Sequence, residues 1–225
     1  KLIKNFSLIK IKYLFIIFLL SPFLIFVVLN IFDFRSFISL NLAMTIISSG
    51  GFLPTNSLSI ILKTQTKEII FSLTMLLSFF SLFFTYNLAI YKQKGIKFIQ
   101  EDIYLIFYLL VICFGCFVLL DKNLDFSLIF LAITSSVSNI GVSMNKTPNY
   151  LSFIFLILII IGGSFYSTSS GLRFIKIYSL FKFSINEMIS HAKPKNVFIN
   201  KLPFSDKNMQ TSDFYKYFLS IMVFI

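Results

Sequence analysis

An apolar segment in the first quarter of the chain, SFISLNLAMTIISSGGF (36–52), begins like a helix and ends in a turn of small residues. Its apolar part, 36–47, is too short to cross a bilayer, because it covers about 18 Å and the hydrocarbon core is about 30 Å thick. A later segment, FSLIFLAITSSVSNIGV (126–142), has the same arrangement, with a short apolar helix over 126–137. Gly51 and Gly141 then occupy matching places 90 residues apart, which indicates an internal duplication.

The chain as a whole has the composition of a membrane protein. It is 57% hydrophobic and 13% charged, with 31 Phe and no Trp, whereas a soluble domain carries roughly 25% charged residues. The runs 13–32, 69–91 and 103–120 carry no charge, and each is long enough for a spanning helix of about 18–20 residues. The two short helices therefore lie between predicted spans.

The net charge of +11 indicates orientation rather than nucleic-acid binding. Most basic residues fall in three alternating connectors, which the positive-inside rule places in the cytoplasm together with the N-terminus. These residues are Lys1, Lys4, Lys10 and Lys12; Lys92, Lys94 and Lys97; and Arg173, Lys176, Lys182, Lys193, Lys195, Lys201, Lys207 and Lys216. No nucleophile–base set and no phosphate-binding loop is present, so an enzyme is not expected.

Each glycine turn has the composition of an ion filter. A polar turn at membrane depth requires protein or water around it, and the preceding half-helix directs its partly negative C-terminal end toward the turn. Backbone carbonyls in such a turn can replace the hydration shell of a cation. The candidate filter residues are Ser48, Ser49, Gly50, Gly51 and Phe52, and Ser138, Asn139, Ile140, Gly141 and Val142. Ordinary turns between helices are the alternative.

The uncharged stretch 149–172 is interrupted. The predicted helix Tyr150–Ile161 covers about 18 Å, so the chain reaches GGSFYSTSSG (162–171) before it has crossed the bilayer. Broken helices of this kind line permeation paths, and an ionisable residue beside one, here Arg173, is a functional candidate. The alternative is a helix that simply ends early, with Arg173 extending to the cytoplasmic interface.

Four segments together resemble the TrkH/KtrB potassium uptake subunits of the Trk/Ktr/HKT superfamily. NLAMTIISSGGFLPT (41–55) is similar to their second filter segment and TSSVSNIGVS (134–143) to their third. IGGSFYSTSSGLRFIK (161–176) resembles the broken second helix of the third repeat, and HAKPKNVFINKLPFSD (191–206) the connector before the fourth. The segments occur in the family's order over nearly the whole chain.

This resemblance implies an all-α polytopic membrane protein of span–pore helix–span units, four of them around one pore. Residues 1–101 would form the second unit and 102–183 the third, followed by a cytoplasmic connector over 184–216 and the start of the next membrane helix over 217–225. Because the chain begins at Lys1 and stops within an apolar run, it is expected to be a fragment.

The implied function is potassium uptake across the bacterial inner membrane, through the carbonyl filter and past a gate loop. The gate-loop residues would be Gly162, Gly163, Ser164, Tyr166, Ser167, Thr168, Ser169, Ser170, Gly171 and Arg173. Three residues depart from the family pattern, Tyr166, Ser170 and Asn139, and Tyr166 is large enough to narrow the gate. The implied partners are the lipid bilayer, a second subunit in a homodimer, and a cytoplasmic nucleotide-binding subunit of the TrkA/KtrA type.

No cofactor is expected beyond the transported K⁺, and two other functions remain open. A secondary transporter of another cation or small solute would also use a broken helix, and a non-transporting membrane fragment would tolerate changes at both glycines. Cys113 and Cys116 lie within a predicted span and are expected to be buried helix residues rather than a redox or metal pair. His191, the only histidine, is expected at the surface, and Glu101 and Asp102 at the interface beside a span.

Overall fold

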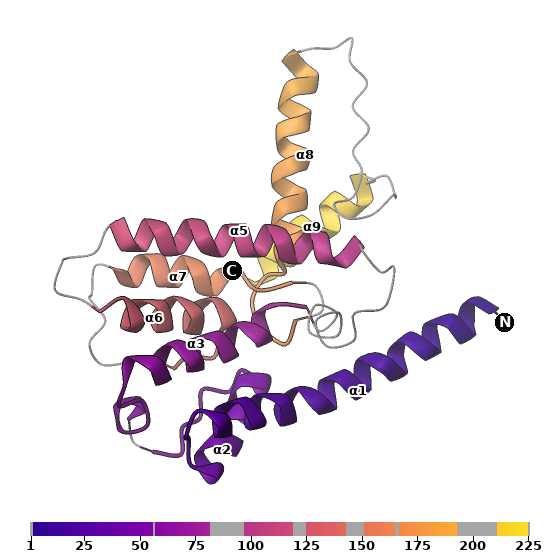
Figure 1. The fold of residues 1–225 in the computed structure, drawn as a ribbon. Helices are drawn as coiled ribbons and strands as arrows, with labels where there is room; N and C mark the ends of the chain where they lie inside the picture. Colours follow the sequence, from indigo (N-terminus) through magenta and orange to yellow (C-terminus); the bar gives the residue numbers. More distant parts are fainter. Residues whose placement is uncertain are drawn as a thin grey trace.

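The computed structural model describes residues 2–55, 57–81, 97–118, 125–142, 151–164, 167–192 and 211–224. This part of the chain consists of helices and their connections (Figure 1). The helices are α1 (Leu2–Ile31), α2 (Ser36–Ser48), the 3-10 turn η1 (Leu58–Ile60), α3 (Gln65–Phe79), α5 (Lys97–Val118), α6 (Phe126–Ser138), α7 (Ser152–Ile160), α8 (Phe174–Ala192) and α9 (Thr211–Phe224). The predicted all-helical fold class is confirmed.

The two short helices expected from the duplicated segments are α2 and α6, and both are 13 residues long. Their ends agree with the sequence prediction to within one residue. Each is followed by a residue in the left-handed conformation, Ser49 or Asn139, which ends the helix as a C-cap. The turns therefore begin where the apolar pattern stops.

The long helix α1 continues through Pro22, which has no backbone N–H to donate to Phe18. The Ser21 hydroxyl donates to the Phe18 carbonyl instead, at 2.9 Å. In α5, the window Glu101–Val118 is long and apolar enough to cross a membrane. Helices α2 and α6 are shorter than a span, and α1 contains residues 13–31 of the uncharged run 13–32.

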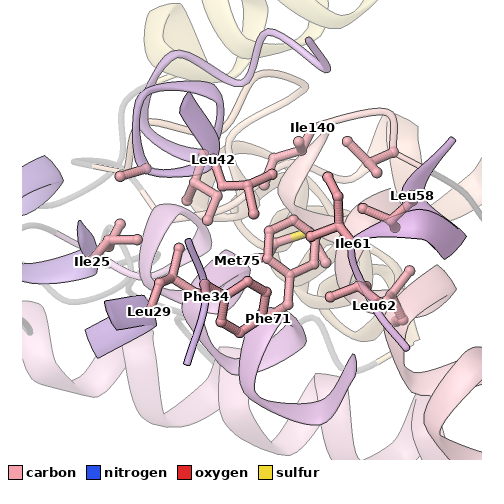
Figure 2. Close-up of a cluster of buried hydrophobic side chains, with 14 of the residues drawn as sticks. Ile25, Leu29, Phe34, Leu42, Leu58, Ile61, Leu62, Phe71, Met75 and Ile140 are labelled. Carbon is pink, nitrogen blue, oxygen red and sulfur yellow. The ribbon is translucent and has the colours of Figure 1, made fainter. Parts of the chain in front are cut away.

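Helices α3 and α6 pack together at the centre, with α1 and α2 on one side and α7 and α5 on the other (Figure 1). A hydrophobic cluster fills the space between α1, α2 and α3, with Phe71 and Met75 of α3 at its centre (Figure 2). Ile140, from the turn after α6, also belongs to this cluster. The second repeat thus contributes to the core of the first.

Polar side chains are buried inside this bundle beside the apolar core, and many large apolar side chains are exposed on its outside. Phe107 and Phe114 of α5 are 67% and 70% exposed, whereas Ser78 and Thr134 are almost fully buried. The buried hydroxyls donate to carbonyls of their own helices, Ser78 to Met75 at 2.8 Å and Thr134 to Leu131 at 3.0 Å. This distribution suits a bilayer, because lipid tails can surround the exposed phenylalanines and these two buried hydroxyls are paired.

The prediction of one continuous helix over 69–91 is wrong. Helix α3 ends at Phe79, and Phe80 has extended backbone angles. No glycine or proline causes this break; the freed carbonyls of Ser78 and Phe79 accept hydrogen bonds from the distant segment 164–169. Residues 82–96 lie outside the described part of the chain.

Helix α7 differs from the prediction at both ends, and α8 and α9 both extend into the predicted connector 184–216. Helix α7 covers Ser152–Ile160, shorter than Tyr150–Ile161, and it ends before Gly162 as expected. Helix α8 continues past residue 183 to Ala192, and α9 begins at Thr211 rather than 217. His191 lies in the last turn of α8, so this helix extends further than the sequence pattern indicates.

Candidate functional site: two glycine turns and an intramembrane loop

The turns after α2 and α6 have the same backbone geometry at a spacing of 90 residues. Gly50 N donates to Thr45 O at 3.1 Å, and Ile140 N donates to Ser135 O at 3.2 Å. Gly51 and Gly141 follow with positive φ angles of 68° and 77°, a region that side-chain-bearing residues rarely adopt. The duplication read from the sequence therefore extends to individual hydrogen bonds.

A hydroxyl group closes each turn. Thr45 Oγ1 donates to Phe52 O at 2.6 Å, and Ser135 Oγ donates to Val142 O. Ser135 Oγ also accepts a hydrogen bond from Val142 N at 2.9 Å. The carbonyls of Phe52 and Val142, both predicted filter residues, are therefore already hydrogen-bonded.

The carbonyls inside the turns, unlike those of Phe52 and Val142, accept no hydrogen bond from the described residues. Among the hydrogen bonds of the described residues, none goes to the carbonyl oxygens of Gly50, Gly51, Ile140 or Gly141. These four groups form two pairs at the 90-residue spacing, and each pair has one member beyond the C-terminal end of α2 and one beyond that of α6. Free carbonyl oxygens beside the partly negative end of a helix are suited to a cation.

The two turns are in contact. A Cβ atom added to Gly51 would lie 2.7 Å from the Ile140 carbonyl oxygen, so the close approach of the two backbones requires glycine at this position. Gly141 has open space around it, and only its φ angle favours glycine. The structure thus brings together the two turns that the sequence pattern had paired.

The segment between α7 and α8, hereafter the loop 162–171, is held at both ends. Gly162 N donates to Leu172 O at 2.8 Å, and Leu172 N donates to Ile160 O at 3.0 Å. A Cβ atom on Gly163 would collide with the Phe79 carbonyl, so the loop touches the broken end of α3. Tyr166 lies outside the described residues.

Hydrogen bonds join this loop to the last carbonyls of α3. Ser78 O accepts from the backbone N–H groups of Thr168 and Ser169, both at 3.1 Å, and Phe79 O accepts from Ser164 N at 3.2 Å. The last carbonyls of a helix have no partner within the helix, so the loop satisfies buried groups that α3 leaves unpaired.

Arg173 lies beside the loop and binds its carbonyls. Its Nη1 donates to Ser164 O at 3.1 Å, to Ser167 O at 3.2 Å and to Ser169 O at 3.1 Å, and it lies 2.8 Å from Ser167 Oγ. In this geometry the guanidinium group is directed to the loop carbonyls.

Two C-cap side chains contact the loop from the turns. Asn139 Nδ2 donates to Ile159 O at 3.1 Å and to Ser170 O at 3.0 Å. The Ser49 hydroxyl lies 3.4 Å from Thr168 O and 3.5 Å from Ser138 O. Both residues are filter candidates because of their backbone carbonyls, and no sequence pattern indicates these side-chain contacts.

Three acidic residues have structural roles that the sequence pattern did not predict. Asp102 and Glu101 are buried rather than interfacial, at 0% and 2% exposure. Asp102 accepts hydrogen bonds from Ser81 N at 3.0 Å and Ser81 Oγ at 2.6 Å, just beyond the end of α3. Glu68, also buried, accepts from the Ser127 hydroxyl at 2.5 Å and so joins α3 to α6. The sequence signal that could have predicted these buried carboxyl groups is an acidic residue near the start of an apolar helix.

The remaining candidates form no site in the described part of the chain. Cys113 is half-buried and Cys116 is buried, and neither forms a disulfide. No group of three or more His, Cys, Asp or Glu residues that could hold a metal ion occurs among the described residues.

No protein-family model matches the sequence, and no curated protein matches it. A crystal structure of the potassium transporter TrkH from Vibrio parahaemolyticus superposes on 94% of this chain with a TM-score of 0.75 and 18% sequence identity. The match covers 47% of the transporter chain, so this chain spans about half of that length. The chain therefore has the fold of TrkH, a polytopic membrane protein, and the resemblance seen in the four segments is confirmed at the level of the fold.

Proposed function

We propose that this chain forms part of a potassium uptake pathway, in which the turns after α2 and α6 supply filter carbonyls and the loop 162–171 gates passage. The observation that carries the proposal is the contact between the two turns. Gly51 lies against the Ile140 carbonyl, and the carbonyls of Gly50, Gly51, Ile140 and Gly141 accept no hydrogen bond within the described residues. Two equivalent sets of free carbonyls at the ends of two half-helices are the arrangement that a cation filter requires.

Potassium is the proposed substrate because the solved transporter with the same fold is described as a potassium transporter. The chain spans about half of that transporter, and two units would supply two of the four filter segments that surround a pore. The remaining segments, a second subunit in a homodimer and a cytoplasmic nucleotide-binding subunit belong to the proposal. So does the orientation in the bacterial inner membrane, with the N-terminus in the cytoplasm.

The proposed gate is the loop 162–171, because it lies directly beside the turns. The Ser49 hydroxyl is 3.4 Å from Thr168 O, and Arg173 holds three loop carbonyls. Catalysis of a chemical reaction is not part of the proposal.

Growth of potassium-uptake-deficient bacteria at low potassium tests this function. The complete gene product is expected to restore growth and to take up radioactive rubidium, with competition by K⁺ but not by an organic solute. A secondary transporter of another solute would show the opposite competition. Failure to restore growth despite normal membrane insertion would overturn the proposal.

A further inference from the structure

Asn139 combines two features that nothing in the proposed function requires. Its backbone is left-handed, with φ of 57°, a conformation that asparagine tolerates better than most residues. Its side chain turns away from the filter turn and donates to two carbonyls of the broken span, at 3.1 and 3.0 Å. One amide group thus uses both of its N–H donors on that span.

The two acceptors lie on opposite sides of the break. Ile159 belongs to the last turn of α7, and Ser170 lies near the far end of the loop. The N–H group that would serve Ile159 O in a continued helix is that of Gly163, and it donates to Ser169 Oγ at 3.0 Å instead. The Asn139 amide therefore satisfies a carbonyl that the break leaves without a helical partner.

The loop has room for this amide only because residue 171 is glycine. A Cβ atom on Gly171 would lie 2.9 Å from Asn139 Nδ2, and the φ angle of 91° also favours glycine there. The equivalent residue of the first repeat, Ser49, has one hydroxyl proton for two carbonyls at 3.4 and 3.5 Å. The second repeat thus holds the loop more firmly than the first.

We propose that Asn139 is a positioning residue that latches the loop 162–171 to the filter turn: its hydrogen bond to Ser170 O must break before the loop can move, while its bond to Ile159 O anchors the amide at the end of α7. This inference rests on the proposed function, because the loop is taken as the gate. It predicts that the latch controls the rate of ion passage. Because Asn139 is also part of the second turn, the latch couples the position of the loop to the filter.

The variant Asn139→Gly in the complete gene product tests the latch, since glycine accepts the left-handed backbone and removes only the amide. Rubidium uptake is expected to rise roughly three- to tenfold, the factor for losing about one net hydrogen bond. Hydrogen–deuterium exchange of the peptide 162–172 is expected to accelerate by a similar factor. Asn139→Asp, which keeps the size but replaces both donors by acceptors, is expected to act in the same direction.

Two controls separate the latch from general damage. Asn41→Ala removes an asparagine that donates at 2.8 Å to Phe37 within its own helix, and both measurements are expected to remain at wild-type values. Ser49→Gly is expected to change rubidium uptake and hydrogen–deuterium exchange less than Asn139→Gly does. Unchanged exchange over 162–172 in both Asn139 variants would overturn the latch. Absence of rubidium uptake by the wild-type protein would overturn the proposed function instead, and the exchange measurement would still test the latch.

Discussion

The turn after α2 and the turn after α6 share a backbone but differ in what surrounds it. Gly51 lies against the Ile140 carbonyl, whereas a Cβ atom added to Gly141 would meet nothing within 4 Å beyond its chain neighbours. The C-cap residues differ as well, since Ser49 makes one long contact to the loop, whereas Asn139 makes two shorter hydrogen bonds, one to the last turn of α7 and one to the loop. Duplication has thus preserved the hydrogen bonds that shape each turn, and the contacts between the copies have diverged.

The largest expected difference concerns the two glycines. Gly51→Ala places a Cβ atom 2.7 Å from a backbone oxygen and also strains the backbone, whereas Gly141→Ala adds only the strain, about 1–2 kcal/mol. We expect Gly51→Ala to abolish rubidium uptake and Gly141→Ala to retain part of it, with weaker discrimination between K⁺ and Na⁺. Uptake competition in cells with matched expression measures both. Equal losses in the two variants would mean that the contact between the turns is unimportant.

A smaller difference is expected for the hydroxyls that close the turns. Ser135 both donates to Val142 O and accepts from Val142 N, whereas Thr45 only donates to Phe52 O. Ser135→Ala therefore leaves a buried N–H group without a partner and is expected to destabilise by about 1–3 kcal/mol, against about 1 kcal/mol for Thr45→Val. Melting temperatures in detergent compare the two variants, and a larger loss for Thr45→Val would contradict the assignment.

The smallest expected effect tests whether the repeats are also joined away from the turns. Glu68→Gln keeps an acceptor for the Ser127 hydroxyl, while Ser127→Ala removes the donor from a buried carboxyl group. We expect Glu68→Gln to lower stability by less than about 1 kcal/mol and Ser127→Ala to lower it more. Thermal unfolding of the two variants beside the wild-type protein measures this. The opposite order would show that the carboxylate charge, rather than the hydrogen bond, matters here.

Much of the fold could be predicted because its signals are local. The half-helices follow from short apolar runs, and the turns follow from Gly51 and Gly141, which have the positive φ angles that glycine allows. The end of α7 before Gly162 follows from a pair of glycines. In each case the residues that cause the helix, the turn or the helix end belong to that same short segment of sequence.

The candidate site was predicted less completely because several of its contacts join distant residues. The carbonyls of Phe52 and Val142 were expected in the filter, but the hydroxyls of Thr45 and Ser135 bind them. Arg173 was expected beside the loop, but its binding to the loop carbonyls has no signature in sequence. Such hydrogen bonds between a side chain and a backbone carbonyl depend on which residues the tertiary fold brings together.

The amino-acid sequence by itself determined that this protein belongs in a bilayer, that its segments are duplicated, and where its glycine turns lie. The length of an apolar run and the backbone freedom of glycine are local properties, so each can be read from one segment. Only the tertiary structure decided where α3 ends. Its last carbonyls, at Ser78 and Phe79, find partners in the loop 162–171, and Asp102 takes the Ser81 N–H group. A helix can end without glycine or proline where remote groups satisfy its free backbone, and those groups meet it only in the folded chain.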